Sequence, residues 1–245
     1  MRYFMRFLTV SIGIYLISPV LHAVDKPNFI LINVDDLGWT DLGCFGSKIY
    51  ETPNIDNLAK NGMRFTDAYA ACAVCSPTRA AIMTGKYPAR LGVTDWIRAR
   101  FQGGKIPNDK KNPMGWIGSK ANKVLCPKNA LWMENEEITI AEQLKKLGYK
   151  TCHIGKWHLG ADDWYPEKQG FDENYGGCDY GQPPSYYDPF SNKRLKGING
   201  LPGKKKGQYL TDRECEEALG FISRNKKEPF FIYFANYAVH TPIQA

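Results

Sequence analysis

The 245-residue sequence contains no Asn-x-Ser/Thr sequon, no internal repeat and no low-complexity segment. Without a sequon, classical N-glycosylation is not expected. Hydrophobic residues make up 43% and charged residues 23% of the chain. This is ordinary globular usage, and it excludes collagen, coiled coil and disorder as descriptions of the whole chain. The length is sufficient for one large domain or two small ones.

Long basic runs are also missing, and the longest is Lys204-Lys205-Lys206. The formal net charge is nevertheless +7. Such a balance is compatible with anionic partners: nucleic acids, acidic glycans, membrane surfaces, and sulfated or phosphorylated small molecules. Because the excess charge is modest and not gathered in a long run, we expect no nucleic-acid partner.

The one long apolar run lies at the N-terminus. Residues 1–23 combine Arg2 and Arg6, an apolar stretch over 7–21 and a cleavage site after Ala23. This arrangement is typical of a secretory signal peptide, and the stretch is short for a membrane span. The alternative is an uncleaved N-terminal anchor. Cleavage would leave residues 24–245 with a net charge of +5 and no stable membrane span. With the missing sequon, this predicts an exported bacterial protein, periplasmic or secreted.

Seven cysteines are an odd number for an exported protein. Cysteines in an oxidising compartment can pair, so at least one of the seven must have another role. The sequence alone does not determine which of them pair. They are Cys44, Cys72, Cys75, Cys126, Cys152, Cys178 and Cys215.

Apolar runs and helical periodicities alternate along the chain. Strands are expected over 28–34, 63–70, 149–154 and 230–235, and helices over 52–61, 76–84, 139–147 and 211–224. Ser76 is the expected N-cap of the second helix, with Pro77 as its first residue. Residues 98–136 and 160–208 are expected to be mostly loop. The pattern predicts an α/β fold with a mainly parallel sheet covered by helices on both faces.

Polar side chains follow three of the expected strands. Asp35 and Asp36 follow the first strand, Lys156 and His158 another, and His240 a third. Ligands of parallel α/β sheets bind outside the carboxyl ends of the strands. The sequence therefore predicts a shared site that contains these side chains.

Asp35 and Asp36 are adjacent carboxylates at the end of a strand. Such groups repel each other unless a cation lies between them, and hard oxygen ligands favour Ca²⁺ or Mg²⁺. The alternative is a simple turn in which one aspartate caps a helix.

Cys75 precedes an expected helix start, and Arg79 lies four residues later. The N-terminus of a helix stabilises negative charge, so a thiolate or an oxyanion would be favoured there. The alternative is a buried or disulfide-bonded cysteine with an exposed arginine.

The segment Cys75-Ser76-Pro77-Thr78-Arg79, with its flank through Arg90, closely resembles the signature of the type I sulfatases, members of the alkaline-phosphatase-like superfamily. Further segments resemble family blocks in the family order. They are Pro27–Gly38, Thr52–Leu58, Gly62–Tyr69, Gly148–Leu159 and His240–Pro242. Together the similar segments extend over nearly the whole of 24–245.

The resemblance implies a particular nucleophile. In that family a formylglycine-generating enzyme oxidises the motif cysteine, here Cys75, to an aldehyde whose hydrated form is a gem-diol. One hydroxyl attacks the sulfur of a sulfate ester, and deprotonation of the other expels sulfate. Cys75 would then be the cysteine that remains outside any disulfide.

The resemblance also implies roles for the remaining polar residues. Asp35, Asp36 and the modified side chain at position 75 would bind the cation, Ca²⁺ rather than Mg²⁺. Arg79 would hold the diol, and Lys156 a sulfate oxygen. His158 would accept the diol's proton, and His240 would contact sulfate or protonate the leaving alcohol. His153 is expected to pack within its strand.

Family members continue beyond the His240 block with a second metal-binding pair and a further sulfate-binding lysine. We therefore expect residues 24–245 to be the N-terminal portion of a catalytic domain that is inactive without the rest. The implied function is sulfate-ester hydrolysis, on a sulfated carbohydrate or an aryl sulfate. Two alternatives stay open: a phosphodiesterase or phosphonate monoester hydrolase of the same superfamily, and an inactive binder of sulfated glycans that uses the lysines of 193–206. In the loops over about 95–135 and 160–208, the side chains that could stack on or pair with a sugar are Trp96, Arg98, Arg100, Trp164, Tyr186 and Tyr187. Surface packing is the alternative explanation for them.

Overall fold

The computed structural model describes residues 26–119, 121 and 123–244. The expected signal peptide, residues 1–23, lies outside the described residues. Within them, no helix is both long enough and apolar enough to cross a membrane.

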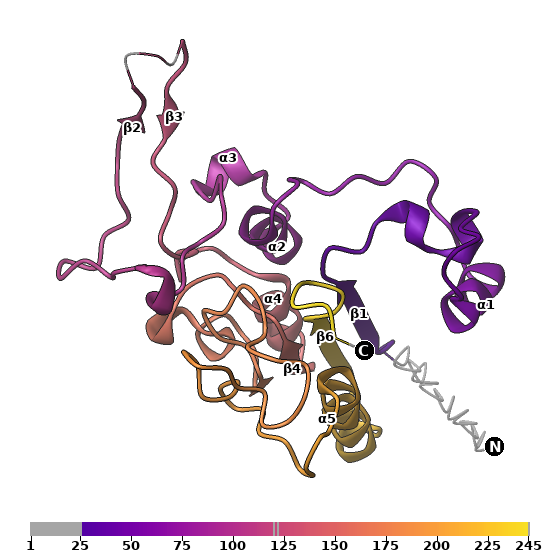
Figure 1. Ribbon diagram of the computed structural model, residues 1–245. Helices are drawn as coiled ribbons and strands as arrows, with labels where there is room; N and C mark the ends of the chain where they lie inside the picture. Colours follow the sequence, from indigo (N-terminus) through magenta and orange to yellow (C-terminus); the bar gives the residue numbers. More distant parts are fainter. Residues whose placement is uncertain (1–25, 120, 122, 245) are drawn as a thin grey trace, which may run out of the picture.

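A four-stranded parallel sheet forms the centre of the molecule (Figure 1). Its strands are β1 (Phe29–Val34), β4 (Lys150–Gly155), β5 (Glu173–Tyr175) and β6 (Phe230–Asn236), and they lie in the order β1-β6-β4-β5. Every pairing within this sheet is parallel. The predicted α/β class with a parallel sheet is therefore confirmed.

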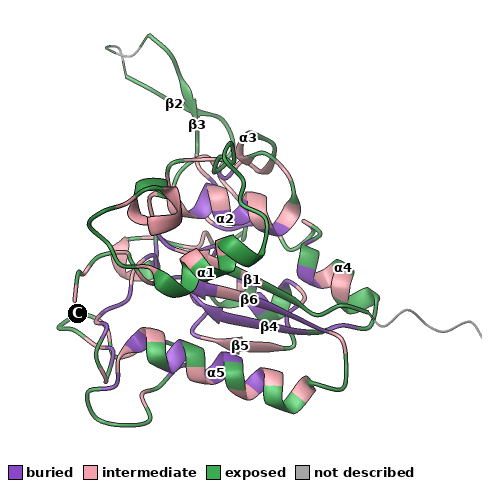
Figure 2. Ribbon diagram, turned by 90° about the vertical axis from the view of Figure 1, so that its right-hand side faces the viewer, coloured by how far each residue is buried: buried purple, intermediate pink, exposed green. Residues whose placement is uncertain are grey.

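Helices cover both faces of the sheet (Figure 2). One face packs on α5 (Leu210–Asn225), and the other packs on α2 (Cys75–Thr84) and α4 (Ile140–Lys146). Strand β6 packs against the helices on both faces, because its side chains alternate between the two faces. Phe231 and Tyr233 join the cluster with α2 and α4, whereas Phe230 and Ile232 join the cluster with α5.

Smaller elements surround this sandwich. The helices are α1 (Pro53–Asn61) and α3 (Pro88–Leu91), and five short 3-10 helices cover Trp39–Asp41, Gly43–Phe45, Arg100–Gln102, Asp162–Trp164 and Pro166–Lys168. Strands β2 (Trp116–Ile117) and β3 (Cys126–Pro127) pair in antiparallel fashion and project away from the body (Figure 1).

The strand expected over 63–70 is wrong. None of these eight residues lies in a strand, and all are exposed. Alternating apolar residues make a strand only where a sheet edge pairs with the backbone and one face is buried. Here Met63, Phe65 and Tyr69 are 66–89% exposed, so neither condition is met within the described residues.

Two further differences concern local signals. Strand β5 lies within the expected loop region 160–208, because its three residues are too few for a pattern and depend on pairing with β4. Helix α2 begins at Cys75 with Val74 as its N-cap, so the Ser76 side chain does not cap it.

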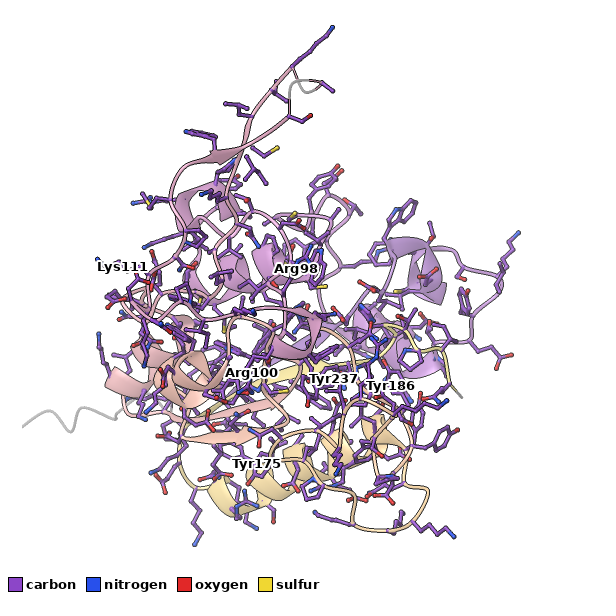
Figure 3. The ribbon with its side chains drawn as sticks, turned by 60° about the vertical axis from the view of Figure 1, so that its left-hand side comes forward. Arg98, Arg100, Lys111, Tyr175, Tyr186 and Tyr237 are labelled. Carbon is purple, nitrogen blue, oxygen red and sulfur yellow. The ribbon has the colours of Figure 1, made fainter. Side chains whose placement is uncertain are left out.

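Residues 186–201 pack tightly although they contain no regular element. Tyr186, Phe190, Ile198 and Leu201 form a buried cluster with the start of α5 and with Tyr237 at the end of β6. Figure 3 shows Tyr186 and Tyr237 close together in the interior. This packing places a buried support behind the carboxyl end of the sheet.

Candidate active site

Three strands end together and bring the predicted residues to one place. Val34 of β1 pairs with Asn236 of β6, and Gly155 of β4 pairs with Ala235. Beyond these pairs, the Asp35 N–H donates to the Ala238 carbonyl at 2.8 Å. The shared site at the carboxyl ends is thus present.

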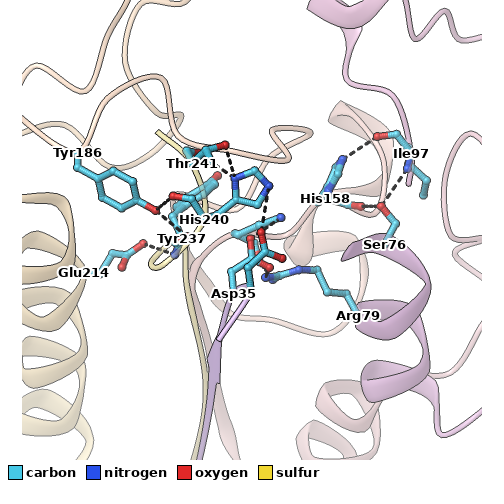
Figure 4. A network of polar contacts seen from close by, with 12 residues as sticks. Asp35, Ser76, Arg79, Ile97, His158, Tyr186, Glu214, Tyr237, His240 and Thr241 are labelled. Carbon is cyan, nitrogen blue, oxygen red and sulfur yellow. Dashed lines mark hydrogen bonds and ion pairs between the residues drawn. The ribbon is translucent and has the colours of Figure 1, made fainter. Parts of the chain in front are cut away.

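Asp35, Arg79 and Lys156 form a buried ion triad. Figure 4 shows Asp35 and Arg79 side by side. Asp35 Oδ1 accepts from Arg79 Nη2 at 2.9 Å, and Asp35 Oδ2 accepts from Lys156 Nζ at 2.6 Å. Arg79 Nη1 also donates to the Lys156 carbonyl at 2.6 Å. Arg79 and Lys156 are 2% and 0% exposed, so each cation depends on these contacts for its charge partners.

The charges within the triad shift the pKa values of its own members. Burial alone would raise the pKa of Asp35, but the charges and hydrogen bonds of Arg79 and Lys156 lower it below the usual value. Burial, together with the nearby Arg79, lowers the pKa of Lys156. The two buried cations exceed the single carboxylate, so the triad carries net positive charge suited to an anionic group.

Cys75 stands at the first residue of α2, beside this positive cluster. Burial would raise the pKa of its thiol, but hydrogen bonds from His240 and Lys156 and the Lys156 charge lower it. The N-terminus of a helix favours the same negative charge. All seven cysteines lie within the described residues and none is disulfide-bonded, so Cys75 is a free, partly accessible thiol.

His240 lies beside the triad, because one of its ring nitrogens is within 4.8 Å of a carboxylate oxygen of Asp35. Its Nδ1–H donates to the Thr241 carbonyl at 2.8 Å, and its Nε2 lies 3.6 Å from Asp36 Oδ2. Tyr186 donates its hydroxyl to the carbonyls of Tyr237 and His240 and so holds this loop. The hydrogen bond with Cys75 raises the pKa of His240. His240 is therefore more readily protonated than an ordinary histidine.

His158 is buried and neutral. Burial, with the charges of Lys156 and Arg79, lowers its pKa to about 3. Its Nε2 lies 2.7 Å from the Ile97 carbonyl, and its Nδ1 has no hydrogen-bond partner among the described residues.

Two cavities adjoin Cys75. One of about 270 Å³ is lined by Cys75, Trp96, Gln102, His158, Gly181, Gln182 and His240. The other, of about 490 Å³, lies toward β1 and includes Asp35, Asp36 and Arg79 in its lining. Residue 75 therefore separates a histidine-lined space from a carboxylate-lined space.

Asp35, Asp36 and His240 are the metal-capable group that the described residues bring together. One ligand atom from each lies within 4.8 Å of the others. Two adjacent carboxylates suit a hard cation such as Ca²⁺ or Mg²⁺. Cys75 is not part of this group, and the expected role of position 75 as a ligand stays a prediction that depends on its modification. His240 enters the group although the sequence indicates for it a role toward substrate.

Other candidate residues are engaged elsewhere. His153 is buried in β4 between Trp157, Phe171 and Tyr233, as the prediction of a packing role requires. Tyr186 is buried, and buried Trp164 stacks on Trp132. These two aromatic residues are therefore unavailable to a sugar in this structure.

The sequence analysis assigned no role in the site to several residues that the structure places there. They are Ser76, Ile97, Gln102, Gly181, Gln182 and Glu214. Glu214 is fully buried on α5, where its carboxylate accepts from Asn236 Nδ2 at 2.9 Å and from the Tyr237 N–H at 3.4 Å. The available signal in the sequence was a glutamate at a position on the apolar face of an amphipathic helix.

The family model for sulfatases matches residues 27–245, and the chain therefore belongs to the sulfatase family. Among curated relatives, human N-acetylgalactosamine-6-sulfatase is 34% identical over 241 residues, which are 91% of this chain and 41% of that protein. The chain spans less than half the length of the curated relatives it matches.

Solved structures agree with this assignment. Ps i-CgsB in complex with k-i-k-neocarrahexaose is 35% identical, with a TM-score of 0.65 over 90% of this chain and 47% of that chain. The protein BT4656 in complex with its substrate D-glucosamine-2-N,6-O-disulfate is 27% identical, with a TM-score of 0.60 over 88% of this chain and 35% of that chain. The strands of the present sheet and their helices thus belong to a sulfatase fold.

Proposed function

We propose that this chain forms the Cys75-bearing part of an exported sulfatase that hydrolyses sulfate esters through a formylglycine made from Cys75. The observation that carries the proposal is the convergence of buried Arg79 and Lys156 with His240 around an unpaired cysteine at a helix N-terminus. In this environment a side chain at position 75 meets positive charge from several directions.

Modification would supply a hydrated aldehyde at position 75, one hydroxyl of which attacks sulfur while the other permits release of sulfate. The surrounding residues prepare both events. Lys156, whose charge lowers the pKa of the Cys75 thiol, would bind a sulfate oxygen. Arg79, held by Asp35 and by the Lys156 carbonyl, would orient the hydroxyls at position 75.

The two histidines suit opposite proton transfers. His158 is neutral and its Nδ1 has no hydrogen-bond partner among the described residues, so it would accept a proton from residue 75. His240 has a raised pKa, so it would donate a proton to the departing alcohol or to sulfate. Their different environments separate the acid from the base within one cavity.

Asp35 and Asp36, with an oxygen of residue 75, would hold a divalent cation, and Ca²⁺ is the proposed ion. When bound, it would offset the charge of sulfate and lower the pKa of a hydroxyl at position 75. The half-exposed Asp36 leaves this cluster accessible to an ion.

A sulfated carbohydrate is the proposed substrate class. Human N-acetylgalactosamine-6-sulfatase supports it, because that relative is named for a sulfated sugar. The two solved structures support it because each was determined with a carbohydrate, neocarrahexaose or glucosamine disulfate, bound. Export to the periplasm or medium is proposed from residues 1–23. The formylglycine-generating enzyme is the proposed maturation partner.

Mass spectrometry of the peptide that contains residue 75, from protein made in the native host, tests the modification. We expect formylglycine at position 75 and unmodified cysteine at Cys72, a matched control three residues away. Unmodified Cys75 in that protein would contradict the catalytic mechanism and favour a sulfated-glycan binder.

Hydrolysis assays of the protein as its gene encodes it test the reaction. We expect sulfate-ester turnover that Cys75→Ala abolishes and Cys72→Ala retains. Faster turnover of phosphate diesters or phosphonate monoesters than of sulfate esters would instead favour the other hydrolases of the superfamily.

A further inference from the structure

Ser76, Ile97 and His158 form a closed set of hydrogen bonds beside the cavity (Figure 4). Ser76 Oγ donates to the His158 carbonyl at 2.8 Å and accepts from the Ile97 N–H at 3.0 Å. His158 Nε2 lies 2.7 Å from the Ile97 carbonyl oxygen. None of the three residues is more than 2% exposed, so water does not compete for these contacts.

The Ile97 carbonyl selects one tautomer of His158. A carbonyl oxygen can only accept, so the hydrogen in this contact belongs to Nε2. The buried ring is neutral and carries one ring hydrogen. Nδ1 therefore keeps its lone pair, and this is the buried nitrogen that lacks a partner among the described residues.

The surroundings restrict rotation of the ring. Gly181 lies against it so closely that an added Cβ would be 2.5 Å from His158 Cε1. His158 itself has a φ of +60°, an unusual conformation for a non-glycine residue. The Ser76 bonds to both Ile97 and the His158 carbonyl hold this backbone where the ring meets its acceptor.

We propose that Ser76, acting through Ile97, is a positioning residue that holds His158 as the Nε2–H tautomer, with Nδ1 free to accept from the hydroxyl of residue 75. His158 and Cys75 line the same cavity. In the proton transfer, the O–H bond breaks, its electron pair stays on oxygen, and the proton binds the Nδ1 lone pair. The resulting imidazolium keeps its Nε2–H bond to the Ile97 carbonyl. The identity of the proton donor rests on the proposed sulfatase function, whereas the tautomer does not.

Nitrogen NMR of the protein with ring-labelled histidine tests the tautomer directly. The sequence has four histidines, and a His158→Gln variant identifies the signals of His158 by their loss. We expect a pyridine-like Nδ1 and a pyrrole-like Nε2 that persist from about pH 5 to about pH 8. A pyrrole-like Nδ1 in the unmodified sequence would overturn the proposal.

Ser76→Ala should convert these two signals into averaged ones, because both tautomers become populated. Thr78→Val is the matched control, since Thr78 Oγ1 makes the same pair of bonds with the backbone N–H and carbonyl of Cys72. The control should leave the His158 signals unchanged. Equal changes in the two variants would reduce Ser76 to a structural role and overturn the proposal.

Ser76→Thr keeps a hydroxyl and decides the case where Ser76→Ala does not fold. We expect it to retain the signals of the unmodified sequence, and loss of the tautomer with the hydroxyl present would overturn the proposal. In a sulfate-ester assay, Ser76→Ala should lower kcat about tenfold with KM within about twofold. Absence of any sulfatase activity would instead contradict the proposed function and leave the tautomer result in force.

Discussion

Residues 36–75 and residues 151–161 both carry segments that resemble the same family, yet their environments are opposite. The first region contains no buried residue, whereas every residue of the second is buried (Figure 2). Strand β4 lies between β5 and β6 in the sheet, with α4 packed on one face and α5 on the other. Among the described residues, nothing buries the first region in this way. Resemblance to the family therefore identifies a segment but does not indicate how deeply the described part of the chain buries it.

The same contrast separates the two adjacent aspartates. The Asp35 side chain is 7% exposed and bound by two cations, whereas the Asp36 side chain is 58% exposed. One residue thus organises the buried site, and its neighbour remains available to an ion. The substitutions below test this difference between buried and exposed partners.

The largest effect is expected from removal of a ring in the buried layer. Phe231→Ala should lower the free energy of unfolding by about 3–5 kcal/mol, because the cavity left behind is closed by packed neighbours. Phe65→Ala, a matched change at a residue 66% exposed, should change it by less than about 0.5 kcal/mol. Urea unfolding measures both, and comparable losses would show that the exposed region is packed in solution.

Loss of the buried carboxylate should be nearly as severe. Asp35→Asn leaves Arg79 and Lys156 buried without an anionic partner and should cost about 3 kcal/mol. Asp36→Asn at the exposed position should cost less than about 0.5 kcal/mol. Thermal unfolding of the two variants at neutral pH measures the difference. Equal melting temperatures would contradict the comparison.

The buried carboxyl of Glu214 on α5 predicts that the stability of the protein depends on pH. Burial raises its pKa to about 7, although hydrogen bonds from Asn236 and the Tyr237 N–H and the charge of Arg79 oppose the shift. A carboxyl whose folded pKa exceeds its unfolded value loses stability as pH rises between the two. Ionisation across that interval should cost about 3 kcal/mol.

Glu214→Gln should remove this loss, so its stability relative to the unmodified sequence should increase from about pH 4.5 to about pH 7. The difference must be measured, because His153 and His158, with pKa values lowered to about 3, give the opposite slope below their unfolded pKa. Urea titrations at several pH values provide it. A pH-independent difference would refute the assignment to Glu214.

The smallest effect is expected from the exposed cation ligand. If Ca²⁺ binds at Asp35 and Asp36, a concentration ten times Kd should raise the unfolding free energy by about 1.4 kcal/mol. Asp36→Ala should abolish most of this increase while leaving metal-free stability almost unchanged. Calorimetry with and without Ca²⁺ measures it, and an equal increase in both proteins would place the ion elsewhere.

Most of the regular elements could be predicted because their signals are local. Strands β1, β4 and β6 have apolar runs, and helices α4 and α5 have apolar faces with suitable ends. The wrong strand at 63–70 and the missed strand β5 share one cause: strand formation depends on a partner edge that sequence periodicity does not contain.

The site was predictable to the extent that its residues follow strands or belong to the signature. Asp35, Lys156 and His240 meet because parallel strands end at one edge of the sheet. The roles of Ser76 and Glu214 were not predictable, because each acts on a segment remote in sequence. Ser76 bonds a residue 82 positions away, and Glu214 one that lies 22 positions away on the next element.

By itself, the sequence determined the α/β class, the likeness to sulfatases and the identity of the residues around Cys75. Local propensities and a contiguous motif are sufficient for each of these inferences. The tertiary structure alone decided that Asp35 is buried and Asp36 exposed, that His158 is neutral with a free Nδ1, and that His240 is readily protonated. Burial and charge partners set these properties, and both come from segments that meet only when the sheet is formed.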